Sequence, residues 1–190
     1  MIDVLEALGH EGAIAVPREL SARMGVTGAA EIVYNKGRMI PCVLDNRITG
    51  MTGHQDNPGT GYTLQGDPTA LLSVEKILTA LGFAPVLTVD PQDLKAMKAA
   101  VDQAVAALDA GQQPAIVTRR PCLLIKRDKF RKGMCRVNAD KCRSCRSCLK
   151  VGCPAISLEN GKAVIDRTQC VGCTVCAQVC PFDAIEKEEK

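Results

Sequence analysis

Short apolar runs alternate with stretches of helical periodicity over the first two thirds of the chain. Four apolar runs are typical of buried strands, at residues 13–16, 39–44, 85–89 and 115–118. Three intervening stretches have the period of helices, at residues 25–36, 69–81 and 91–110. Strands that alternate with helices predict an α/β domain with a doubly wound sheet.

The last third of the chain has a different pattern. Two short β-prone stretches, 155–158 and 162–165, are joined by Asn160-Gly161, a strong hairpin signal. Around them lie nine of the eleven cysteines. We therefore expect an α/β domain over residues 1–120, a basic linker over 121–133, and a small α+β domain over 134–190.

The cysteines form a repeat. One segment reads Cys142-x-x-Cys145-x-x-Cys148-x4-Cys153-Pro154, and the other Cys170-x-x-Cys173-x-x-Cys176-x3-Cys180-Pro181. Three cysteines at two-residue gaps hold one [4Fe–4S] cluster from a single loop, and in two-cluster ferredoxins the fourth ligand comes from the other loop. The predicted ligands are therefore Cys142, Cys145, Cys148 and Cys180 for one cluster and Cys170, Cys173, Cys176 and Cys153 for the other.

Other roles for these thiols are less favoured. A zinc site needs four ligands and would not require a third cysteine at the same gap, followed by Cys-Pro, twice. Disulfides need an oxidising compartment, and the start of the chain (Asp3, Glu6, Glu11) lacks the features of a signal peptide. No apolar run approaches the roughly 20 residues of a membrane span. We expect a cytoplasmic protein without a membrane partner, and we expect Cys135, which precedes the repeat, to be a buried thiol that binds no metal.

The formal net charge of +3 is small, but basic residues crowd the stretch before the cysteine repeat. They are Arg119, Arg120, Lys126, Arg127, Lys129, Arg131 and Lys132. A solvated linker is the favoured interpretation, and a docking surface for an acidic partner comes second. Nucleic acid is not expected, since aromatic residues make up 3% of the chain and stacking platforms are missing.

A polar, glycine-rich loop, residues 44–61, follows the second predicted strand. Open α/β sheets bind ligands at the carboxyl ends of their strands. Hydroxyls, amides and backbone N–H groups suit a diphosphate and a Mg²⁺ ion, although a glycine-rich stretch can also be an ordinary loop.

The loop sequence LDNRITGMTGHQDNPGTG, with Ile32 to Lys36 before it and Thr118 to Cys122 after it, resembles the C-terminal part of the alpha subunit of indolepyruvate ferredoxin oxidoreductase. In that family a thiamine-diphosphate domain runs directly into two [4Fe–4S] motifs, the first with the x4 gap. The resemblance implies that Asn46 gives its side-chain oxygen and Ile48 its carbonyl to Mg²⁺. It places His54 near the reactive thiazolium, and it implies diphosphate contacts along the stretch from Thr49 to Gln55, including Thr49, Thr52, Gly53 and Gln55.

The resemblance also implies an activity: oxidative decarboxylation of a 2-oxoacid such as an arylpyruvate, with acyl-CoA formation and single electrons passing through the clusters to ferredoxin. Two departures stand against a complete enzyme. Where the family has a Mg²⁺-binding aspartate this chain has Pro17-Arg18-Glu19, and the family's pyrimidine-binding domain lies outside the chain. Three interpretations stay open: a split or truncated subunit that works with others, a non-catalytic electron carrier whose α/β half is a docking scaffold, and a gene remnant.

Overall fold

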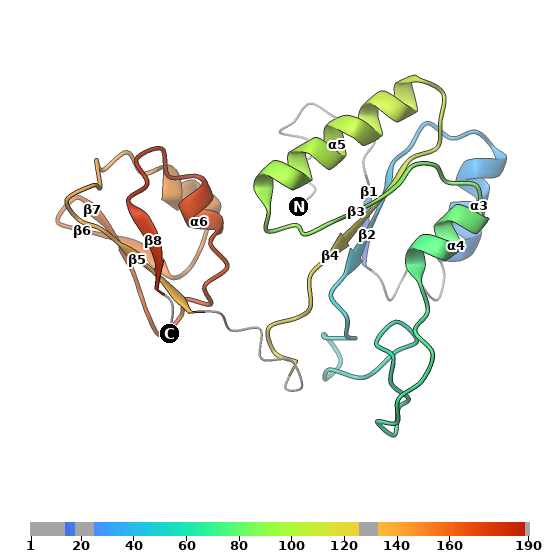
Figure 1. The fold of residues 1–190 in the computed structure, drawn as a ribbon, viewed down its shortest axis with the longest axis horizontal. Coiled ribbons are helices and arrows are strands. Elements are labelled where there is room, and N and C mark those ends of the chain that lie inside the picture. Colours follow the sequence, from blue (N-terminus) through green and yellow to red (C-terminus); the bar gives the residue numbers. More distant parts are fainter. Residues whose placement is uncertain (1–13, 18–24, 126–132, 189–190) are drawn as a thin grey trace. The chain divides into compact units, whose positions relative to one another are not determined.

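The computed structural model describes the backbone of residues 14–17 and the whole of residues 25–125 and 133–188 (Figure 1). The chain divides into two compact units, residues 1–125 and 126–190. Arg18 and Glu19 lie outside the described residues, as does the stretch 126–132 of the predicted basic linker.

A four-stranded parallel sheet forms the centre of the first unit, in the order β1-β2-β4-β3. Its strands are β1 (Ile14–Pro17), β2 (Pro41–Asp45), β3 (Val86–Val89) and β4 (Ala115–Arg119). Asp45, the last residue of β2, is in register with Arg119, the last residue of β4. Parallel pairing therefore brings the residues that follow β2 and β4 to one edge of the sheet.

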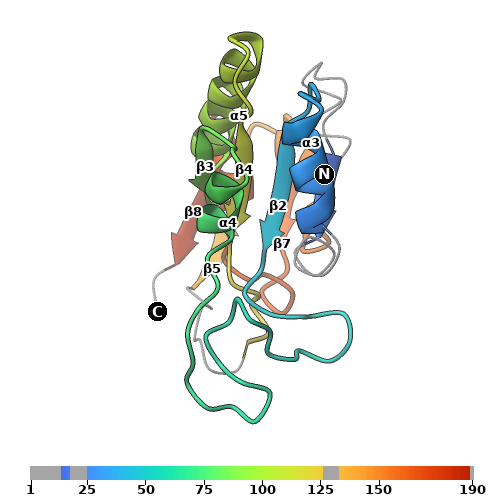
Figure 2. The same ribbon diagram turned by 90° about the vertical axis from the view of Figure 1, so that its right-hand side faces the viewer.

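Helices cover both faces of this sheet. On one face, Val101 and Ala104 of α5 (Leu94–Asp109) pack against Cys42 and Ile116. On the other face, α4 (Val74–Ala80) and α3 (Val26–Tyr34) pack over Val43 and Val117. Figures 1 and 2 show α5 and α3 on opposite sides of the strands. The predicted doubly wound α/β fold is confirmed.

One predicted helix is shorter than expected. The apolar periodicity predicts a helix over 69–81, but α4 begins at Val74. The Ser73 hydroxyl accepts a hydrogen bond from the Lys76 amide (3.2 Å), so Ser73, itself in an extended conformation, is the N-cap. None of the described helices is long and apolar enough to cross a bilayer.

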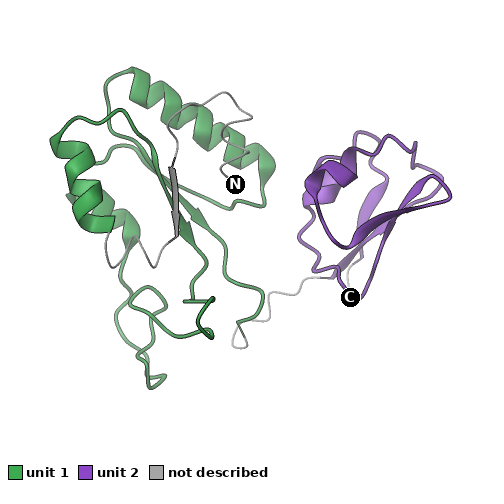
Figure 3. Ribbon diagram, turned by 180° about the vertical axis from the view of Figure 1, so that it is seen from behind, with its two compact units in different colours: residues 1–125 green, residues 126–190 purple. Residues whose placement is uncertain are grey.

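The described part of the second unit, residues 133–188, is built from two small antiparallel sheets and two short helices (Figure 3). Its elements in chain order are β5 (Met134–Val137), η2 (Ser147–Val151), β6 (Ile156–Glu159), β7 (Lys162–Ile165), α6 (Val175–Gln178) and β8 (Ile185–Glu188). β5 pairs with β8, and β6 pairs with β7. Asn160 and Gly161 join β6 to β7 with φ of 49° and 78°, so the predicted hairpin is confirmed.

Candidate functional site

The two cysteine loops repeat in backbone conformation as well as in sequence. In each loop the second and the fourth residue after the first cysteine have positive φ. These residues are Ser144 (57°) and Arg146 (62°) in the first loop and Gly172 (68°) and Thr174 (65°) in the second. Left-handed residues reverse the chain between successive cysteines, and the third cysteine then lies in a short helix, η2 or α6. Each loop thus presents its thiols from a compact turn.

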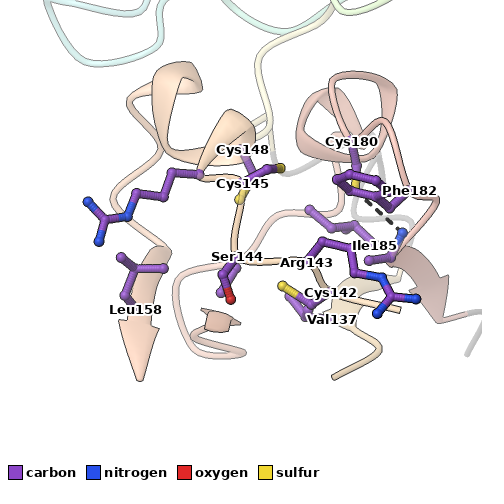
Figure 4. A pocket seen from close by; sticks show the side chains of 13 residues that line it. Val137, Cys142, Arg143, Ser144, Cys145, Cys148, Leu158, Cys180, Phe182 and Ile185 are labelled. Atoms are coloured by element: carbon purple, nitrogen blue, oxygen red, sulfur yellow. Dashed lines mark hydrogen bonds between the residues drawn. The ribbon is translucent and has the colours of Figure 1, made fainter. Parts of the chain in front are cut away.

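The thiols of the first loop share one cavity with a thiol from the second (Figure 4). Its lining includes Cys142, Cys145 and Cys148 together with Cys180, and apolar side chains such as Leu158 and Ile185. These cysteines line the walls of the cavity. In the described part of the chain, no group of three or more Cys, His, Asp or Glu side chains is placed to hold a single metal ion. Four cysteines around one cavity suit a [4Fe–4S] cluster, and these are the four ligands predicted for the first one.

Hydrogen bonds favour the thiolate form of the more open cysteines. The backbone amides of Ala163 and Ser144 lower the pKa of Cys142. The Ser147 hydroxyl and amide lower the pKa of Cys145, with Sγ and Oγ 3.5 Å apart. Burial raises the pKa of Cys148. Iron binds thiolates, so the donors around Cys142 and Cys145 favour ligation.

The second loop brings Cys170, Cys173 and Cys176 together with Cys135 of β5. The Cys135 backbone amide donates to Cys170 Sγ (3.3 Å), and the Cys135 and Cys176 side chains are hydrogen-bonded. Burial, together with the neighbouring sulfurs of Cys135, Cys173 and Cys170, raises the pKa of Cys176 to about 12. Cys135 is 1% exposed, as expected, but it also contacts two predicted ligands.

Cys153, the predicted fourth ligand of the second cluster, follows η2 and packs against the same apolar core as these cysteines. Its carbonyl accepts a hydrogen bond from the Ile156 amide (3.1 Å). Its ligation, and the assignment of all eight cysteines to clusters, stay predictions.

Replacing Cys135 with Ala tests whether this thiol is a ligand or a neighbour. The substitution keeps the backbone amide that donates to Cys170, so we expect no loss of iron. A Cys176 thiolate bound to iron could only accept a hydrogen bond from the Cys135 thiol, so removing that thiol should lower the reduction potential of the second cluster. Iron analysis and an EPR-monitored redox titration measure both. Loss of about four iron atoms per chain would show that Cys135 is a ligand.

The predicted thiamine residues lie in one loop at the carboxyl end of β2. At the base of the loop, Asn46 Oδ1 accepts a hydrogen bond from the Ile48 amide (3.1 Å), and the Asn46 carbonyl accepts one from the Cys122 amide (2.9 Å). Ile48 is buried. The Asn46 side chain is therefore held by its own turn, and the Asn46 backbone by the segment that follows β4.

Beyond Ile48 the loop folds back on itself. Thr49 and Gln55 exchange two backbone hydrogen bonds of 3.1 Å, and the Thr52 hydroxyl donates to the Gln55 side chain (2.6 Å). The tip between them, which includes Gly53 and His54, is exposed, and His54 has a φ of 63°. The structure thus brings the predicted cofactor residues into one loop, with Asn46 and Ile48 at its base and the others in the projecting part.

A charged network supports the base of this loop. The Asp45 side chain is 0% exposed and pairs with Arg119 Nε (2.8 Å) and Arg47 Nε (3.4 Å). Arg119 also pairs with Glu75 of α4. Partial burial opposes ionisation of Glu75, but hydrogen bonds from its own backbone amide, Ser73 and Arg119, and the charge of Arg119, lower its pKa to about 2.

The structure corrects the interpretation of two residues of the basic stretch as part of a solvated linker; the linker bounds, 121–133, stay a prediction. Arg119 ends β4, and Arg120 pairs with Asp90 (2.5 Å), so both arginines belong to the sheet edge. The other members of the basic stretch lie at 126–132, outside the described residues.

The donor atoms at the base of the loop fit a hard cation in part. Asn46 Oδ1 and the Ile48 carbonyl are oxygen donors of the kind Mg²⁺ prefers, and a diphosphate would supply further oxygens. The Asp45 carboxylate, by contrast, is engaged by Arg47 and Arg119. If Asn46 and Ile48 bind Mg²⁺ as the resemblance implies, the loop supplies two oxygens, and the other ligands come from the diphosphate and from other residues.

Comparison with protein families shows the family to which the α/β unit that contains this loop belongs. The model of the C-terminal TPP binding domain of thiamine pyrophosphate enzymes matches residues 6–118. The chain belongs to the thiamine pyrophosphate enzymes. A 4Fe-4S binding domain matches residues 163–186, which contain the second cysteine loop. The cofactors of this thiamine pyrophosphate enzyme chain are therefore thiamine diphosphate and [4Fe–4S] clusters, as the sequence predicted.

Individual relatives agree with the resemblance found in the loop. The chain is 40% identical over 171 residues to the indolepyruvate oxidoreductase subunit IorA of Pyrococcus abyssi, which covers 86% of this chain and 26% of that protein. The subunit of the same name from Thermococcus kodakarensis is 41% identical over 170 residues, covering 85% and 26%. A putative electron transport protein, YsaA of Escherichia coli, is 39% identical over 70 residues, 35% of this chain and 44% of that protein. The chain thus spans about a quarter of the length of the IorA relatives it matches.

Two features of these sites were missed in the sequence. The pairing of Asp45 with Arg119 joins residues 74 positions apart, although opposite charges at the ends of two apolar strands were a usable signal. Cys135, which contacts the second loop, lies in β5, and no local sequence pattern predicts that β5 pairs with β8.

Proposed function

We propose that the chain is the C-terminal part of a cytoplasmic 2-oxoacid:ferredoxin oxidoreductase that forms acyl-CoA, with an arylpyruvate such as indolepyruvate as substrate. The observation that carries the proposal is the succession, in one thiamine pyrophosphate enzyme chain, of a TPP binding domain and a cavity lined by four cysteines. Its IorA relatives are named as indolepyruvate oxidoreductase subunits. Other chains would supply the rest of the thiamine site.

Each unit has a distinct part in this reaction. Thiamine diphosphate, when bound, supplies the chemistry that removes CO₂ from a 2-oxoacid and releases two electrons. In this chain Asn46 and Ile48 would hold Mg²⁺, while Thr49, Thr52, Gly53 and Gln55 would lie along the diphosphate, with His54 nearby. Cys142, Cys145, Cys148 and Cys180 would hold the first cluster and Cys170, Cys173, Cys176 and Cys153 the second. Clusters held by these cysteines would supply one-electron transfer to ferredoxin.

Calorimetry on the full chain tests the thiamine half of the proposal. With clusters reconstituted and Mg²⁺ present, we expect binding of thiamine diphosphate, and we expect Asn46→Ala to weaken it about 10- to 100-fold, the usual cost of disturbing a metal site. Asn35→Ala is the matched control, because Asn35 is an exposed amide at the end of α3 whose side chain donates a hydrogen bond to Glu31, four residues earlier in the same helix. Equal affinities for Asn46→Ala and Asn35→Ala would contradict the assignment.

A second function is favoured by the arginine at position 18, where the resemblance calls for a Mg²⁺ ligand. In that case the chain is a ferredoxin-like electron carrier, and the α/β unit is a docking scaffold without cofactor. A positive charge there would repel the metal ion. No heat of binding for thiamine diphosphate, with both clusters visible by EPR and able to reduce ferredoxin, would favour this second function.

A further inference from the structure

The two cysteine loops differ in exposure and charge, although their backbones repeat. In the first loop most of the residues between Lys141 and Arg146 are exposed, Cys145 among them. In the second loop no residue from 170 to 176 is exposed, and none of them is charged. A cluster held by the first loop therefore has a ligand at the surface of the unit, and a cluster held by the second is shielded.

Cations surround the accessible loop. Arg143 and Arg146 line the cavity of the four cysteines, and Lys150 is an exposed residue of η2, two positions after Cys148. Among the described residues, no ion pair involves these three cations. Other cations of the unit, such as Lys141 and Arg167, are paired with Glu186 and Glu188. Of the five cations of the unit's described part for which no ion pair is found, three thus lie at the accessible loop, and the other two are Lys162 and Lys187.

An exposed aromatic ring lies at the same cavity. Phe182 is 44% exposed and lines the cavity two residues after Cys180, as Figure 4 shows. It is one of three phenylalanines in the chain. Aromatic and arginine side chains are the residues most enriched in protein interfaces and their hot spots, and here both kinds border the same redox site.

We propose that an acidic one-electron carrier protein docks on this surface, formed by Arg143, Arg146, Lys150 and Phe182, and takes electrons from the first cluster. The inference rests on the proposed function and adds that electrons leave the chain from the first cluster. Complementary charge steers the encounter, and the open Cys145 side brings the acceptor close to the cluster. In each transfer the reduced first cluster loses one electron and the oxidised acceptor gains it, with no bond made or broken.

Stopped-flow reduction of an acidic ferredoxin tests the proposal. The probe is an oxidised plant-type [2Fe–2S] ferredoxin of net negative charge, mixed anaerobically with the full chain after reduction by dithionite and removal of the excess. At low ionic strength we expect Arg143→Glu/Arg146→Glu to lower the second-order rate constant by about 10- to 100-fold and to flatten its salt dependence. Arg143→Gln/Arg146→Gln, a milder pair, should give an intermediate rate.

The matched control reverses two other exposed cations, Arg167→Glu/Lys187→Glu, neither of which lines the cavity. Iron content and cluster potentials are measured for every variant, and an uncharged quinone serves as second acceptor. The docking surface is supported if the Arg143/Arg146 variants reduce ferredoxin more slowly but reduce the quinone at the unmodified rate, with unchanged cluster potentials. The control pair should change neither rate. If the unmodified chain reduces ferredoxin and the Arg143/Arg146 variants match it or the control pair, the docking inference is wrong. If the unmodified chain cannot reduce ferredoxin at all, the proposed electron transfer fails as well.

Discussion

Replacing Cys180 with Ser should remove the cluster of the first cysteine loop, not that of its own loop. Cys180 belongs to the second motif by sequence, but it lines the cavity of Cys142, Cys145 and Cys148. Its Sγ accepts a hydrogen bond from the Ala184 amide (3.4 Å), which holds the sulfur at that cavity. We expect the iron content to fall from about eight to about four atoms per chain, or to about seven if a three-iron cluster remains.

Double substitutions show which cluster is lost. Cys145→Ser/Cys180→Ser should retain one cluster, because both residues would serve the first, whereas Cys173→Ser/Cys180→Ser should retain none. Cys122→Ser is the control, since this half-buried thiol lies in the first unit and should not affect iron. Iron analysis and EPR of the reduced chain give the readout. The opposite result for the two double variants would overturn the crosswise assignment.

Asp45→Asn should destabilise the first unit by about 3–5 kcal/mol, the usual cost of removing one partner of a buried ion pair. The Asp45 carboxylate also accepts a hydrogen bond from the Arg47 amide (3.1 Å), so the substitution weakens the turn that precedes Ile48 as well as the pair with Arg119. We expect weaker binding of thiamine diphosphate to accompany the loss of stability, because the base of the loop is less ordered.

Denaturation by urea, followed anaerobically by far-UV circular dichroism, measures this effect on the full chain. The control is Asp109→Asn, which breaks an ion pair with Arg38 whose side chains are 58% and 70% exposed. Exposed pairs contribute about 0–1 kcal/mol, so this control should change little. Equal destabilisation by the two substitutions would show that the Asp45 network has no special structural role.

Much of the fold could be predicted from the sequence because its signals are local. Apolar runs marked all four strands of the sheet, and the Asn160-Gly161 turn marked the hairpin, since few dipeptides adopt two successive left-handed conformations. The start of α4 was predicted too early, because periodicity continues through residues 69–73 while the cap at Ser73 fixes where the helix begins. A capping side chain outweighs an apolar pattern at a helix end.

The functional sites could be predicted from the sequence only where the spacing of their residues identifies them. Repeated gaps identified the cysteines, but the contact of the second loop with Cys135 of β5 joins residues 35 positions apart. The charge network at Asp45 likewise depends on the register of β2 and β4. Long-range pairings of this kind leave no signal in a window of ten or twenty residues.

Metal analysis of the anaerobically purified full chain, combined with EPR of its reduced form, tests the central claim most directly. Two [4Fe–4S] clusters predict about eight iron and eight labile sulfide atoms per chain and the spectrum of two neighbouring paramagnetic centres. Zinc in place of iron, or no more than about four iron atoms, would contradict the account.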